Sequence, residues 1–213
     1  MKITPLLFFL SVVGFSAVYA GGYQTLTTTV AVEESGPFEK GGHEVDVAGM
    51  LLHSPVIVIG HRPVLNYAQG DISMGWMLTS PSPLFNKNWL RGNWEFLGNA
   101  FGAGVVGGPK GYMVGGRVLL RYNFVQPDTR WVPFWQLGAG ALGDDIYKNH
   151  PQTEVGGPFE FTLVSDAGVR YFITQKCAAI LMADFEHVSN AGLYRRNLGV
   201  NAVGGSLGLG FFF

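Results

Sequence analysis

Three features of the sequence predict an all-β fold, an eight-stranded antiparallel transmembrane β-barrel. Apolar and polar residues alternate with period two, the alternating segments are about 10 to 13 residues long, and the chain ends in three phenylalanines. Soluble strands peak near 5–6 residues, whereas a strand that spans a bilayer needs about 9–11. Composition agrees, because 14% charged residues and 31 glycines in 213 residues exclude disorder and argue against a coiled coil. A net charge of −1 gives no basic field, so nucleic acid is not an expected partner.

Residues 1–20 have the three parts of a secretory signal peptide. Lys2 supplies the positive charge, Leu6 to Val18 is apolar, and Val18-Tyr19-Ala20 is a small-x-small cleavage site. The alternative is a retained anchor helix, but this apolar run is shorter than the roughly 20 residues that a span needs. We expect residues 1–20 to be removed and residues 21–213 to form one β-barrel domain.

The segment 159–171 shows the alternation that defines the strands. Phe159, Phe161 and Leu163 share one parity, while charged residues such as Glu160 and Asp166 share the other. A soluble sandwich and a barrel in lipid both bury one apolar face per strand. Charges within single strands favour the barrel, because a polar lumen can hold them as ion pairs; these charges are Glu160, Asp166, Arg170, Arg117 and Arg121. Aromatic residues near strand ends resemble an interfacial girdle; they are Trp76, Trp89, Trp94, Tyr122, Phe124, Trp131, Trp135 and Tyr171.

The alternation gives nine candidate segments, whereas the barrel is expected to have eight strands. They lie near 22–33, 43–59, 70–79, 91–104, 112–124, 130–142, 159–171, 178–189 and 201–213. Bacterial barrels have an even number of strands and eight is the smallest size, so one early segment is not a full strand. The last segment ends in Phe211-Phe212-Phe213, which resembles the terminal strand by which outer-membrane barrels are recognised for assembly.

Neither a cofactor nor a metal is expected. The string G-x-G-x-x-G occurs at 102–107 and at 138–143, but a dinucleotide site needs it to open a helix after a strand. Here both strings lie in strand-like surroundings, where glycines relieve crowding. None of the five histidines pairs with another ligand at metal-binding spacing.

One polar constellation has the residue types for nucleophilic catalysis. His187 and Ser189 are two residues apart on a predicted strand, so they share a face with Cα atoms about 6.6 Å apart. At that distance an imidazole nitrogen can accept the proton of a serine hydroxyl. Both share the parity of Phe185, and Asn201 shares the parity of Val203, so all three residues are expected on the lipid-facing wall. Asp184 and Glu186 have the opposite parity and are expected to face the lumen.

The strand count also predicts the depth of this constellation. With an even number of strands both termini lie in the periplasm, so the loop 190–200 is extracellular and His187 and Ser189 lie near the outer-leaflet surface. A polar pair on a lipid-facing wall is costly unless it serves a purpose. The alternative is that these residues are interfacial and simply end the apolar band.

A longer string around this pair resembles a known family. The string is His187-x-Ser189-Asn190-Ala191-Gly192-Leu193, followed by Asn197, Gly199, Asn201 and a strand that ends in Phe. It resembles the lipid A 3-O-deacylase (acyloxyacyl hydrolase-like) family, which is built on eight-stranded outer-membrane barrels. The close match covers about the last 27 residues.

The resemblance implies a role for each matching residue. Ser189 would be the nucleophile, His187 the general base and Asn197 the donor to the oxyanion. Asn190 would support Asn197 in that role and contact the substrate. Characterised members have a Glu that orients the histidine, and Asn201 stands at that position here. An amide carbonyl can fix the histidine tautomer but cannot stabilise an imidazolium by charge.

Two arginines of the same loop are candidate substrate contacts. Arg195 and Arg196 could hold a lipid phosphate, although a solvated surface accounts for them equally well.

The predicted function is that of an outer-membrane serine esterase. It would remove an ester-linked hydroxyacyl chain from lipid A, the anchor of lipopolysaccharide in the outer leaflet of a Gram-negative-type bacterium. The alternative is a non-catalytic small barrel, structural or adhesive, that has lost the catalytic acid. A passive pore is a weaker third possibility, because side chains fill the lumen of an eight-stranded barrel.

Overall fold

The computed structural model describes residues 36–54 and 65–213. The elements are β1 (His43–His53), β2 (Asn66–Met77), β3 (Ser82–Leu84), β4 (Lys87–Gly107), β5 (Tyr112–Asn123), β6 (Trp131–Asp144), the 3-10 turn η1 (Ile146–Lys148), β7 (Phe159–Thr174), β8 (Cys177–Ser189) and β9 (Val200–Phe212). Within these ranges no helix is long and apolar enough to cross a membrane. The expected signal peptide, the segment 22–33 and the end of the segment 43–59 lie outside the described residues.

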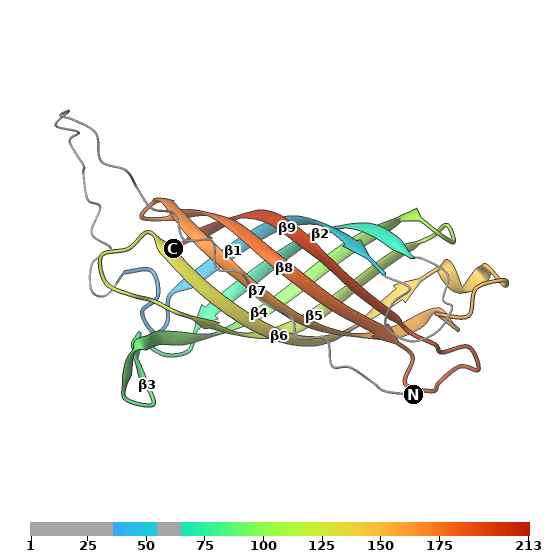
Figure 1. Cartoon of the computed structure of the whole chain (residues 1–213), viewed down its shortest axis with the longest axis horizontal. Helices are drawn as coiled ribbons and strands as arrows, with labels where there is room; N and C mark the ends of the chain where they lie inside the picture. Colours follow the sequence, from blue (N-terminus) through green and yellow to red (C-terminus); the bar gives the residue numbers. More distant parts are fainter. Residues whose placement is uncertain (1–35, 55–64) are drawn as a thin grey trace, which may run out of the picture.

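Eight of these strands close into an antiparallel barrel, which confirms the predicted fold. Going round the barrel, the order is β2, β1, β9, β8, β7, β6, β5, β4, and the pairing of β2 with β4 closes the ring (Figure 1). β3 pairs only with β4 and stands outside the ring. The predicted segments 70–79 and 91–104 overlap β2 and β4 but have other bounds, because β2 begins at Asn66 and β4 runs from Lys87 past the barrel rim.

Side chains alternate between the outer wall of the barrel and its lumen. On β7, Phe159, Phe161 and Leu163 are exposed on the outer wall, whereas Glu160 and Thr162 are buried in the lumen. Because successive side chains of a strand point to opposite faces, each strand can present an apolar face to lipid and a polar one to the lumen.

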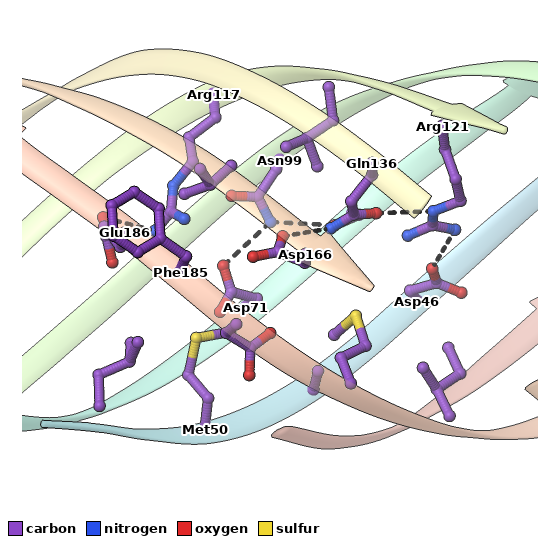
Figure 2. A pocket seen from close by; sticks show the side chains of 18 residues that line it. Asp46, Met50, Asp71, Asn99, Arg117, Arg121, Gln136, Asp166, Phe185 and Glu186 are labelled. Atoms are coloured by element: carbon purple, nitrogen blue, oxygen red, sulfur yellow. Dashed lines mark hydrogen bonds and ion pairs between the residues drawn. The ribbon is translucent and has the colours of Figure 1, made fainter. Parts of the chain in front are cut away.

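The middle of the lumen holds a network of buried ion pairs, as predicted. Arg121 contacts Glu44, Asp46 and Gln136, and Arg170 contacts Glu44, with every one of these groups buried. Figure 2 shows Arg121 turned toward Asp46 and Gln136, which extends in turn to Asp166. The cavity beside this network measures about 40 Å³. The network therefore leaves little space beside it in this part of the lumen.

Apolar clusters lie on both sides of this polar layer. The cluster toward the C-terminal end includes Phe38, Phe172 and Phe212, whose rings contact one another edge-on or tilted. The cluster toward the other end consists of Leu52, Leu65, Tyr67, Phe101, Ala103, Met113, Leu142, Ile146, Val155, Val188, Val200 and Ala202. The described lumen therefore has apolar clusters toward both ends and a network of ion pairs between them.

The two ends of the barrel differ. The connections 108–111, 145–158 and 190–199 meet at one end, which we call the loop end. The connections 78–86, 124–130 and 175–176 lie at the end that carries Phe213 (Figure 1). The outward-facing aromatic residues predicted as a girdle gather toward this C-terminal end; they include Trp76, Trp94, Trp131, Trp135 and Tyr171.

Candidate active site

The last residues of β8 include the predicted catalytic pair. Leu181 and Phe185 are exposed on the outer wall, and His187 and Ser189 continue that row half-buried. Glu186 and Val188, which alternate with them, are buried in the lumen. The structure therefore places His187 and Ser189 on the outer wall, at the loop end of the barrel.

The three residues form one hydrogen-bonded chain. His187 lies directly opposite Asn201 on β9, and its Nδ1 is 2.7 Å from Asn201 Oδ1. Since a carbonyl oxygen only accepts, Nδ1 carries the hydrogen and Nε2 is left with its lone pair. The hydroxyl of Ser189, with Oγ 3.0 Å from Nε2, donates to that lone pair. This is the arrangement of nucleophile, base and orienting group that activates a serine.

No carboxylate takes the place of Asn201 in the described part of the chain. Glu186 accepts hydrogen bonds from Tyr67 and Thr162 inside the lumen. Three acids in and just before the 145–158 connection are engaged with backbone N–H groups; they are Asp144 with Tyr147, Asp145 with Tyr112 and Glu154 with Thr153. The imidazole is therefore oriented by an amide.

Asn190 shapes the loop that follows the serine. Its side chain is 0% exposed, its Nδ2 donates to the carbonyl of Arg196 at 2.8 Å, and its Oδ1 accepts the N–H of Gly192 at 3.0 Å. These bonds use the whole amide. Asn190 therefore positions the 190–199 loop, in place of the substrate contact that the resemblance implied.

Asn197 is exposed in this loop, close to the predicted nucleophile Ser189. Its Oδ1 accepts the backbone N–H of Asn190 at 2.9 Å, directly after Ser189. That bond fixes the amide and leaves Nδ2, which carries two hydrogens, as a donor. A donor held in advance near the nucleophile is what an oxyanion requires.

Arg196 joins the catalytic loop to its neighbour. Its guanidinium donates to the carbonyls of Tyr147, Gln152 and Asn149 at 2.6, 3.1 and 3.3 Å. Because these bonds involve both terminal nitrogens, Arg196 braces the loop, and its contact with a lipid phosphate stays a prediction. Arg195 is exposed and keeps that possibility.

Gly199 closes the loop against the imidazole. Its φ is +71°, and a Cβ at this position would lie 3.3 Å from Cε1 of His187 and 3.0 Å from the carbonyl oxygen of Val188. A side chain there would be strained and would press on the catalytic base.

A shallow hollow on the outer wall begins beside Ser189. Strand register aligns Ser189 with Phe161, and then with Ala141, Gly116 and Ala100 on the next three strands. Ala141 lies near the loop end of β6, whereas Ala100 lies near the middle of β4, so this line runs from the rim down into the apolar band. The hollow is lined by Phe161 and these three small residues, among others. Sequence reasoning missed it, because small residues on the outward parity of separate strands line up only once the register is known.

The described residues offer no site for a metal. No group of three or more His, Cys, Asp or Glu side chains is arranged to hold an ion in residues 36–54 and 65–213.

Comparisons with known proteins agree with the barrel fold. The family model described as lipid A 3-O-deacylase (PagL) matches residues 69–210. The crystal structure of the outer membrane enzyme PagL is 15% identical, with a TM-score of 0.57 over 76% of this chain and 97% of that one. The crystal structure of Neisserial surface protein A is also 15% identical, with a TM-score of 0.50 over 81% and 96%. No curated protein gives a match. The structural similarities show the fold alone, whereas the family model spans most of the sequence, and the chain therefore belongs to the lipid A 3-O-deacylase (PagL) family.

Proposed function

We propose that this protein is an outer-membrane serine esterase that removes an ester-linked hydroxyacyl chain from lipid A. The observation that carries the proposal is the hydrogen-bonded chain Ser189–His187–Asn201 on the outer wall of the barrel. The family and the barrel fold support the substrate class and a location in a Gram-negative-type outer membrane. Residues 1–20 would be the cleaved signal peptide that directs export.

The proposed chemistry is acyl transfer in two steps. His187 Nε2 takes the proton of Ser189 as Oγ attacks the ester carbonyl, and Asn197 Nδ2 donates to the oxyanion that forms. His187 then protonates the departing sugar hydroxyl, which leaves an acyl group on Ser189. A water molecule, deprotonated by His187, attacks this acyl-enzyme, and the fatty acid departs as Ser189 recovers its proton.

The position of Ser189 suits a substrate that stays in the membrane. Lipid A holds its ester groups at the outer-leaflet surface, the depth that we propose for the loop end of the barrel. The acyl chain would follow the hollow over Ala141, Gly116 and Ala100 into the apolar band. Arg195, exposed in the adjacent loop, would contact a lipid phosphate.

Mass spectrometry of lipid A tests this proposal. Purified protein in detergent is expected to remove one hydroxyacyl mass, and Ser189→Ala is expected to remove none, since catalysis without the nucleophile falls by several orders of magnitude. Ser165→Ala is the matched control, because Ser165 is also half-buried on the outer wall, where its hydroxyl contacts Trp135 Nε1. Equal product from Ser189→Ala and from the unmodified protein would refute the assignment.

A second candidate is a non-catalytic barrel, and Asn201 favours it. Loss of the orienting carboxylate removes the charge that would stabilise an imidazolium. If the folded barrel releases no acyl chain but Asn201→Glu does, the protein is a relic of the enzyme. If neither protein releases an acyl chain, the enzyme is excluded, and loss of the carboxylate alone does not explain the inactivity.

A further inference from the structure

The hairpin formed by β3 and the first residues of β4 lies outside the barrel and ends in an apolar tip. Its turn is Phe85-Asn86, with φ values of +51° and +57°, as in the type I′ turns that close two-residue hairpins. Phe85 is 80% exposed and Trp89 is 72% exposed, more than any other large apolar side chain that the structure describes. Nothing in the described part of the barrel covers either ring.

The base of this hairpin is fixed to the barrel. Arg91 donates to the carbonyl of Val125 at 2.8 Å, Gln126 donates to the carbonyl of Arg91 at 3.1 Å, and the Tyr122 hydroxyl donates to the carbonyl of Leu90 at 2.6 Å. These bonds come from β5 and the connection after it. The direction of the hairpin is therefore set by the barrel.

Gly92 permits this departure from the barrel wall. A Cβ there would lie 2.0 Å from the carbonyl oxygen of Asn123 and 2.9 Å from the ring of Tyr122. Because Gly92 has no side chain, the backbone of β4 passes close to that of β5 and can turn outward. Figure 1 shows the hairpin, labelled β3, projecting across the long axis of the barrel instead of continuing along it.

The tip continues an aromatic surface that already faces lipid. At the same end of the barrel, Trp94 packs on Tyr122 with ring centroids 4.9 Å apart, and Trp76 packs on Phe96 at 6.1 Å. Tryptophan and tyrosine gather where membrane proteins meet the lipid headgroups. A hairpin that leaves this belt sideways stays at the depth of the headgroups.

The charge of the hairpin also suits the depth of the lipid headgroups. Lys87 is exposed directly after the turn, and the hairpin from Ser82 to Arg91 has no acidic residue. A phosphate headgroup pairs with such a cation while the rings enter the apolar boundary.

We propose that this hairpin is an anchor in the membrane interface, with Phe85 and Trp89 inserted among the lipids of the leaflet at the C-terminal end of the barrel. The occupant of this surface is a lipid headgroup layer. The anchor fixes the barrel against tilting and sliding at the end opposite to Ser189. The proposal does not depend on catalysis.

Spin labels in the full-length protein test the depth of the hairpin. Cys177, the single cysteine, is replaced by Ser, and a label is placed at Asn88. Reference labels are placed at Leu207, on the lipid-facing wall of β9, and at Lys110, exposed in a loop at the other end. The protein is reconstituted in phosphatidylethanolamine–phosphatidylglycerol vesicles, and collisions with oxygen and with a water-soluble nickel chelate on both faces are measured.

The label at Asn88 is expected to be shielded from nickel and reached by oxygen, as at Leu207. Nickel access equal to that at Lys110 would overturn the proposal and leave a soluble partner as the occupant of the tip. In the double variant Phe85→Asp, Trp89→Asp, nickel access at Asn88 is expected to rise to the level at Lys110. Persistent shielding in this variant would show that the two rings do not anchor the hairpin; heat-modifiable mobility on a gel confirms in each case that the barrel is folded.

Discussion

Polar side chains occupy two regions of this barrel under opposite conditions. In the lumen, Arg121 and Arg170 are buried and each contacts several partners. On the outer wall, His187 and Ser189 are half-buried and joined to Asn201 by a single line of hydrogen bonds. Multiple pairing keeps the lumen groups in one arrangement, whereas the wall groups keep an open side. The comparison agrees with a structural role for the lumen network and with the chemical role that we propose for the wall.

The largest expected effect is on the lumen side of this comparison. Replacing Arg170 by Met leaves Glu44 and Glu95 with less positive charge nearby, and removal of one partner from a buried ion pair costs about 3–5 kcal/mol. Urea unfolding in lipid vesicles is expected to show this loss, while folded protein deacylates lipid A at the normal rate. Lys110→Met is the control, since Lys110 is exposed. An unchanged unfolding midpoint would show that the network is not needed for stability.

The second largest effect is expected at the site on the outer wall. Asn197→Ala is expected to lower kcat by about 10²–10³-fold, or about 3–4 kcal/mol, as loss of an oxyanion donor does elsewhere. KM is expected to change little and the unfolding midpoint to fall only slightly, because this exposed side chain loses one hydrogen bond, the one from the Asn190 N–H. Asn197→Asp separates the two tasks of this residue, since it keeps an acceptor for the Asn190 N–H but no amide donor. Full activity in the Asp variant would mean that Asn197 only shapes the loop.

A smaller effect is expected where the hollow reaches the middle of the barrel. Ala100→Phe is expected to lower kcat/KM for long-chain esters by about tenfold and to spare short-chain esters, because one or two methylenes in an apolar site are worth about 1–3 kcal/mol. A series of esters of increasing chain length measures this. Ala167→Phe, on the exposed face of β7 away from the hollow, is the control. Equal losses for all chain lengths would place the acyl chain elsewhere.

The smallest expected effect is a gain. Asn201→Glu exchanges a neutral partner of His187 for a charged one, which strengthens such a hydrogen bond by about 1–2 kcal/mol and gives about a tenfold higher kcat. Single-turnover deacylation of lipid A measures it, with Asn201→Leu as the variant that removes the acceptor. A slower Glu variant would indicate that the site is built for the amide.

The fold was predictable because the alternation is local. Within each strand the alternation of apolar and polar residues shows which side chains face lipid and which face the lumen, as in Phe159 to Leu163. The same parity placed His187, Ser189 and Asn201 on one wall. The parity could not show how the loops are held. Arg196 binds three backbone carbonyls of the 145–158 connection, and a carbonyl acceptor has no signature in the sequence. The hairpin was missed because Pro81-Ser82-Pro83 is typical of a loop, whereas β4 extends past the rim and pairs with Ser82 and Leu84.

The layered lumen has a consequence for the cell that carries the protein. Its described cavity of about 40 Å³ has room for about three water molecules, between apolar clusters at both ends. Antibiotics and nutrients find no continuous aqueous route along such a lumen. With the activity that we propose, a high copy number would therefore change the lipids of the outer leaflet without opening a route through the barrel, in contrast to a porin, for which every added copy raises permeability.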